Sequence, residues 1–79
     1  MIKVVVNFIS IYAEKLGKQR IYELPELTIA EKLIEILSSE FHDIKIKPII
    51  LVNYRFPKEG QVLNNGDVVL VMPPFAGGK

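Results

Sequence analysis

The amino-acid sequence predicts an α+β fold, in which one mixed sheet carries a single helix packed on one of its faces. Two apolar, β-branched segments at residues 2–11 and 67–72 have the composition of strands, and one amphipathic segment lies between them. The 79 residues suit one small domain. Because the chain has no cysteine, its core has to be stabilised without disulfides.

Residues 2–11 are expected to form the first strand. Successive side chains of a strand point to opposite faces. Here both faces are largely apolar, with Ile2, Val4, Val6 and Phe8 on one and Lys3, Val5, Asn7 and Ile9 on the other. Such a strand is typical of the middle of a sheet. Residues 12–17 are expected to connect it to an antiparallel second strand at residues 19–24, which Pro25 ends.

Residues 28–41 have the pattern of one amphipathic helix. The segment Thr28-Ile29-Ala30-Glu31 has the form of a capping box, in which the Thr28 hydroxyl accepts from the Glu31 N–H and the Glu31 carboxylate accepts from the Thr28 N–H. Apolar side chains then recur every four residues, at Ile29, Leu33, Leu37 and Phe41. This spacing places them on one face of the helix, which is expected to lie on the sheet.

A third strand is predicted at residues 49–53. The preceding connection, residues 42–48, contains Ile44 and Ile46, which are candidates for a short extended piece. Residues 54–56 are a candidate for a brief further strand, stopped by Pro57.

The last strand is predicted at residues 67–72. It follows a turn at Asn64-Asn65-Gly66-Asp67, since Asn and Gly tolerate positive φ. Pro73-Pro74 ends the strand because proline has no N–H to donate.

The element order is therefore β-β-α-β-(β)-β, with the most apolar strands first and last. If both are central, they lie side by side and parallel. That arrangement is the β-grasp, or ubiquitin-like, roll, with a mixed four- to five-stranded sheet over residues 1–74 and a flexible tail at residues 75–79. The side chains expected in its core are Val4, Val6, Ile29, Leu33, Leu37, Leu51, Val69 and Val71.

Composition argues against several classes of function. Ten Lys and Arg are scattered among nine acids, and a formal net charge of +1 gives no basic surface for nucleic acid. The apolar runs are far shorter than the roughly twenty residues that cross a bilayer. The opening MIKVVV lacks the regions of a signal peptide, so we expect a cytoplasmic protein with no membrane partner.

The residues offer no constellation for catalysis or metal binding. His42 is the only histidine, and its position near the end of the predicted helix suits a capping or dipole-compensating residue. No glycine-rich segment opens a helix as a phosphate-binding loop does. We interpret the chain as a non-enzyme with no bound cofactor and no metal site.

The most informative segment is the C-terminal Pro73-Pro74-Phe75-Ala76-Gly77-Gly78-Lys79. The two prolines favour an extended exit from the last strand. From Pro73 to Gly78 the chain reaches roughly 20 Å at about 3.3 Å per residue. Gly77 and Gly78 carry no side chains, so backbone at these positions fits a channel too narrow for other residues.

Together these segments resemble the small subunit of molybdopterin synthase, the MoaD branch of the MoaD/ThiS sulfur carriers. The resemblance covers essentially the whole chain. It rests on the Gly66-Asp67 turn followed by a strand, on Pro-Pro-x-x-Gly-Gly, on Val52-Asn53 and on the β-grasp order. The thiamine-pathway carriers are similar in fold but usually lack the double proline.

The resemblance implies a chemistry for the tail. A partner of the ubiquitin-activating type, an adenylyltransferase, uses ATP to adenylate the terminal glycine carboxylate, and sulfur from a persulfide then gives a thiocarboxylate. The large synthase subunit uses that sulfur to build the dithiolene of molybdopterin. Gly78 would carry the sulfur, Gly77 would supply clearance, and Phe75 and Ala76 would line the mouth of the partner's channel. ATP belongs to the activating partner.

A docking surface is expected to accompany the tail. If Val4 and Val6 face the helix, Val5 faces outward together with Leu70 and Met72, and this patch is a candidate contact for both partners. Ordinary central-strand packing is the alternative. Arg55 is a candidate to pair with a partner carboxylate, with a solvated arginine as its alternative.

Lys79 departs from the family pattern, in which the second glycine is terminal. With Lys79 attached, Gly78 is held in an amide that adenylation cannot use. Removal by a peptidase, a cloning remnant, and a chain that is not a carrier remain open. Two functions compete with sulfur carriage to molybdopterin: a ubiquitin-related modifier or tRNA-thiolation carrier with the same chemistry, and a ubiquitin-like interaction module whose tail is never activated.

Overall fold

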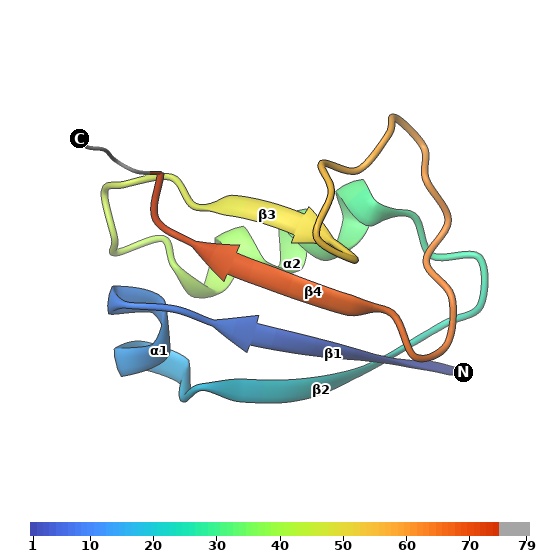
Figure 1. Ribbon diagram of the computed structural model, residues 1–79, viewed down its shortest axis with the longest axis horizontal. Coiled ribbons are helices and arrows are strands. Elements are labelled where there is room, and N and C mark those ends of the chain that lie inside the picture. Colours follow the sequence, from blue (N-terminus) through green and yellow to red (C-terminus); the bar gives the residue numbers. More distant parts are fainter. Residues whose placement is uncertain (75–79) are drawn as a thin grey trace.

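A computed structural model describes residues 1–74 and contains one four-stranded sheet in this part of the chain. The elements in chain order are β1 (Ile2–Phe8), α1 (Ile11–Leu16), β2 (Gln19–Leu24), α2 (Ala30–Glu40), β3 (Ile49–Val52) and β4 (Val68–Met72). The strand order is β2-β1-β4-β3, and α2 lies against one face of the sheet (Figure 1). The predicted β-grasp roll is confirmed.

The two central strands are the first and the last, as predicted. β1 and β4 are parallel neighbours, with Val5 beside Val68 and Asn7 beside Leu70. β2 pairs antiparallel with the other side of β1, and β3 pairs antiparallel with β4. The two faces of β1 differ in burial: Ile2, Val4, Val6 and Phe8 are buried on the helix side, whereas Lys3, Val5 and Asn7 on the other face are exposed or half-buried.

The core lies between α2 and the sheet. Six of the eight expected core residues are fully buried: Val4, Val6, Leu33, Leu37, Val69 and Val71. Leu51 is only half-buried, because β3 turns the alternate residues Ile50 and Val52 toward the helix. Ile29 is 37% exposed, because it pairs with Val62 in an isolated bridge ahead of the helix. These two assignments were wrong.

Aromatic side chains close the core at the end of α2. Phe41 stacks edge-on against Phe8 and Tyr12, with ring centroids 5.8 and 4.9 Å apart. Tyr12 belongs to α1, a short helix where the sequence predicted only a connection. The chain leaves β1 at Phe8 rather than at residue 11, since Ser10 takes a positive φ that a strand cannot continue through.

The predicted capping box does not form. Residue Ile29, not Thr28, precedes the first helical residue, and no side chain caps the helix. The Thr28 hydroxyl instead donates to the Pro25 carbonyl over 2.6 Å, and the Glu31 carboxylate accepts from the Gly60 N–H at 2.8 Å. The cause is non-local. Backbone bonds join residues 28–30 to residues 61–63 and hold the segment ahead of α2 extended.

The candidate short strands are also absent from residues 1–74. Residues 54–56 include only a single bridge, Val52 with Arg55, which closes a tight turn. Residues 42–48 form a turn and a bend without a strand at Ile44 or Ile46. No helix in the described part of the chain is long and apolar enough to span a membrane.

Candidate functional site

The face of the sheet away from α2 is the part of the fold that no described element covers (Figure 1). We call it the open face. Its apolar side chains come from all four strands and are Val5, Ile21, Ile49, Leu51, Val68, Leu70 and Met72. All seven are half-buried or exposed, whereas their neighbours along β1, β3 and β4 are mostly buried against the helix.

The structure brings the predicted docking residues together on this face. Val5 pairs with Val68 on β4, two residues before Leu70, and Met72 follows two residues later. Leu70 lies between Asn7 and Leu51, and Met72 lies beside Ile49. An apolar stripe therefore runs along β4 from its first residue to the root of the tail.

Arg55 is not part of that stripe. It is exposed and lines a cleft of about 630 Å³ beside the end of β3, together with Val52, Asn53, Phe56, Lys58, Glu59 and Gln61. Its bridge partner Val52 points into the core, and residues paired across strands share a side. The Arg55 side chain thus leaves the backbone on the helix side of the sheet, opposite the open face.

A hydrogen-bond network fixes the start of β4, and sequence reasoning did not assign its members this role. The Asn53 amide donates to Asp67 Oδ1 at 3.1 Å and accepts from the Val68 N–H at 3.0 Å. Asp67 Oδ2 accepts from the Asn64 N–H at 2.8 Å. The signal in the sequence is the pair of motifs Val52-Asn53 and Gly66-Asp67, which turn out to contact each other.

The turn after β3 contains Tyr54 in a backbone conformation that is unusual for tyrosine. Val52 and Arg55 exchange two backbone hydrogen bonds, of 2.8 and 3.1 Å, around Asn53 and Tyr54. Both central residues have positive φ, 52° for Asn53 and 68° for Tyr54, as in a type I′ turn. Asn accepts this conformation readily, but Tyr does not. No pattern in the sequence distinguishes Tyr54, because its backbone conformation is visible only in the structure.

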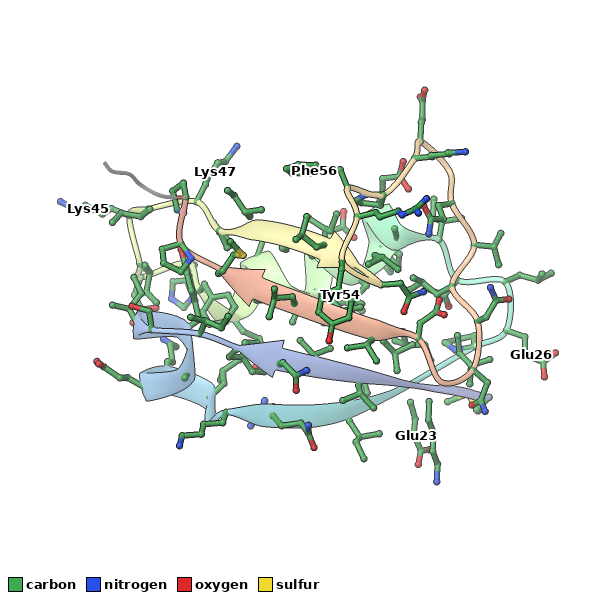
Figure 2. The ribbon with its side chains drawn as sticks, in the orientation of Figure 1. Glu23, Glu26, Lys45, Lys47, Tyr54 and Phe56 are labelled. Atoms are coloured by element: carbon green, nitrogen blue, oxygen red, sulfur yellow. The ribbon has the colours of Figure 1, made fainter. Side chains whose placement is uncertain are left out.

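The root of the tail lies at the opposite end of β4. The Ile9 N–H donates to the Val71 carbonyl over 3.0 Å, and Pro73 and Pro74 follow Met72. Lys47 projects near this corner of the molecule (Figure 2). The Tyr12 hydroxyl donates to the Ile46 carbonyl over 2.8 Å and so fixes the segment that carries this lysine; burial raises the pKa of Tyr12.

The predicted tail residues Phe75, Ala76, Gly77 and Gly78, and with them Lys79, lie outside the described residues. The remaining candidate, His42, is within hydrogen-bonding distance of the end of α2, with Nδ1 3.0 Å from the Ser39 carbonyl. Within residues 1–74 no group of three His, Asp or Glu side chains is placed to hold a metal ion. The candidate site of the described residues is thus the apolar open face around Val5, Leu70 and Met72.

Comparison with known proteins supports the fold. A Pyrococcus furiosus protein with a provisional assignment as molybdopterin converting factor subunit 1 has 26% identity and a TM-score of 0.81, covering 95% of this chain and 100% of that one. Small archaeal modifier protein 1 of Haloferax volcanii has the same fold at 13% identity, with a TM-score of 0.79 and coverage of 95% and 100%.

A third solved structure is a protein complex of subunits 1 and 2 of the molybdopterin-converting factor of Helicobacter pylori. Its matching chain has 22% identity and a TM-score of 0.67, covering 98% of this chain and 100% of that one. No curated protein sequence matches significantly. The ThiS family pattern matches residues 6–78, nearly the entire sequence. The chain belongs to the ThiS family of ubiquitin-like sulfur carriers, whose members are small carrier subunits and not enzymes.

Proposed function

We propose that this protein carries sulfur for molybdopterin synthesis on the C-terminal carboxylate of Gly78. The observation that supports this most is the family match, which continues through Gly77 and Gly78. The Pyrococcus furiosus protein, matched over its full length at 26% identity, favours the molybdopterin branch of the family. ATP would be consumed by the activating partner, and the carrier itself would bind no cofactor.

The proposed reaction has three balanced steps. The Gly78 carboxylate attacks the α-phosphate of ATP, releasing pyrophosphate and giving an acyl-adenylate. The terminal sulfur of a donor persulfide then displaces AMP and forms an acyl disulfide. A second thiol attacks the donor's sulfur, which leaves the thiocarboxylate on Gly78 and a disulfide on the donor. Because the carboxylate of Gly78 has to be free, Lys79 must first be removed by hydrolysis of its peptide bond. A peptidase is therefore a proposed third partner.

The described residues would present the tail and provide the contact. β4 pairs with a strand on each side, and this pairing fixes the point at which the chain leaves the sheet. The open face around Val5, Leu70 and Met72 provides apolar area beside that exit, as protein interfaces do. The Phe75 to Gly77 segment would pass through the partner's channel.

The second candidate function is protein modification or tRNA thiolation by the same activated glycine. The fold shared with the small archaeal modifier protein keeps it in consideration. The two functions differ in the molecule that accepts the sulfur or the activated carrier. We expect thiocarboxylated carrier, mixed with the cognate large synthase subunit and the molybdopterin precursor, to yield molybdopterin. Sulfur transfer to tRNA or conjugation to protein lysines, with no molybdopterin formed, would support the second function.

A further inference from the structure

Tyr54 is held in a conformation that the fold alone does not favour. Its φ of 68° lies in the left-handed region, where a side chain with a Cβ costs energy and glycine does not. The two backbone bonds between Val52 and Arg55 enforce the turn, and the side-chain bonds of Asn53 hold it against β4. A glycine or asparagine at position 54 would satisfy the same turn with less strain.

The tyrosine side chain contributes little to the fold in return. It is 69% exposed, so it buries little apolar surface. Within residues 1–74 its hydroxyl makes no hydrogen bond. Strained residues that the core does not require are concentrated at functional sites. The packing of the described residues therefore does not account for a tyrosine at position 54.

The location of Tyr54 suggests a role in binding a partner. Tyr54 lies in front of β4, on the side of the sheet away from α2 (Figure 2). The preceding residue, Asn53, donates its N–H to the Val68 carbonyl over 2.7 Å, so the turn sits at the first residue of β4. Tyr54 thus extends the open face at one end, while Met72 and the tail root lie at the other.

We propose that Tyr54 is an aromatic anchor through which the cognate adenylating enzyme recognises this carrier. The inference rests on the proposed function and adds a recognition residue to it. That enzyme is the partner common to both acceptor fates considered above. A few residues carry most of the binding energy of a protein interface, and tyrosine is enriched among them.

The geometry allows one partner to contact both ends of the open face. The chain from Pro73 to Gly78 reaches at most about 20 Å, so a protein that holds Gly78 lies close to Met72. The four steps from Val68 to Met72 extend about 13 Å along β4. An interface of standard size covers about 800 Å² on each partner, a patch about 30 Å across. One interface of this size can therefore reach both Tyr54 and Met72.

The test measures binding of the adenylating enzyme to the full chain ending at Gly78, together with thermal unfolding. Tyr54→Asn removes the ring but keeps a residue suited to positive φ. We expect it to weaken binding about 10- to 30-fold, as loss of a dominant aromatic contact does. Because strain is relieved, its melting temperature is expected to rise by about 4 °C.

Two further variants isolate the ring. Tyr54→Phe retains the aromatic surface and is expected to bind within about threefold of the wild type, since the hydroxyl has no role in the proposal. Phe56→Asn is the matched control, because Phe56 is equally exposed, at 72%, but lies at the edge beyond β3 and lines the cleft (Figure 2). It is expected to bind like the wild type.

The outcomes separate this inference from the proposed function. Wild-type binding by Tyr54→Asn, in a chain that is still thiocarboxylated, would overturn the anchor and leave sulfur carriage intact. Weakened binding together with a lowered melting temperature would assign Tyr54 a structural role and also overturn it. A wild type that binds the enzyme through Tyr54 but is never thiocarboxylated would support the anchor and contradict sulfur carriage.

Discussion

At the scale of single residues, Asn53 connects two motifs that lie far apart in the sequence, Val52-Asn53 and Gly66-Asp67. Its side chain bonds both to the carboxylate of Asp67 and to the backbone of Val68, while its own backbone accepts positive φ. The adjacent Gly66, at φ 90°, donates to the Lys3 carbonyl over 2.8 Å and brings the same turn to β1. Three strands are thus tied together where β4 begins.

Two replacements of Asn53 should separate the contribution of its side-chain hydrogen bonds from that of its positive φ. Asn53→Gly loses the side-chain bonds but keeps the turn, and we expect a loss of about 1–2 kcal/mol in unfolding free energy. Asn53→Ala also disfavours positive φ and is expected to lose about 1 kcal/mol more. Chemical denaturation measures both. Equal stability of the two variants would contradict the account of the turn.

Leu33 tests the packing of α2 on the sheet. It is 1% exposed, so Leu33→Ala leaves a cavity and should cost about 2–5 kcal/mol of unfolding free energy. The matched control is Leu27→Ala, the same deletion at a residue that is 79% exposed, with an expected change within about 0.5 kcal/mol. A loss below about 1 kcal/mol for Leu33→Ala in denaturant titration would mean that this helix face is not the packed one.

At the scale of elements, the start of α2 is stabilised by a distant loop rather than by a local cap. The Glu31 carboxylate accepts a hydrogen bond from the Gly60 N–H, and this bond is the main cause that lowers the pKa of Glu31 below its ordinary value of 4.5. A lowered folded-state pKa means that the contribution is present above pH 4.5 and is lost as pH falls through the lower folded-state pKa.

Glu31→Gln should therefore change the pH dependence of stability. We expect the wild type to lose melting temperature more steeply than the variant as pH falls below 4.5, because only the wild type has this carboxylate to protonate. At pH 7 the variant should be the less stable of the two. Parallel pH profiles for the two proteins would show that the Gly60 contact does not contribute.

The elements also show which features the sequence could predict. The alternation along β1 and the four-residue spacing of Leu33 and Leu37 are set by burial in the core, and both predictions were confirmed. The six residues of α1 are too few for helical periodicity to be recognised. The capping box failed because the backbone of Thr28 pairs with Leu63, thirty-five positions away, and no local pattern contains that information.

At the scale of the whole molecule, the order of strands places the candidate interface. Parallel pairing of β1 with β4 puts Val5 beside Val68, and α2 leaves that face open (Figure 1). Motif and strand parity were enough to predict Val5, Leu70 and Met72 on this face. They could not predict that Tyr54 lies on the open face, because its position depends on the backbone conformation of the turn after β3. Nor could they predict that the Arg55 side chain lies on the helix side of the sheet.

Sulfur carriage is tested most directly by the intact mass of the chain after incubation with its cognate adenylating enzyme, ATP and a persulfide donor. The form ending at Gly78 is expected to gain the mass of one sulfur in exchange for one oxygen. The form retaining Lys79 should stay unchanged, since Gly78 then has no carboxylate, and Gly78→Ala should react poorly because of its added methyl group. Thiocarboxylation of the Lys79 form without cleavage would contradict the tail chemistry. An inert Gly78 form would contradict sulfur carriage itself and favour an interaction module.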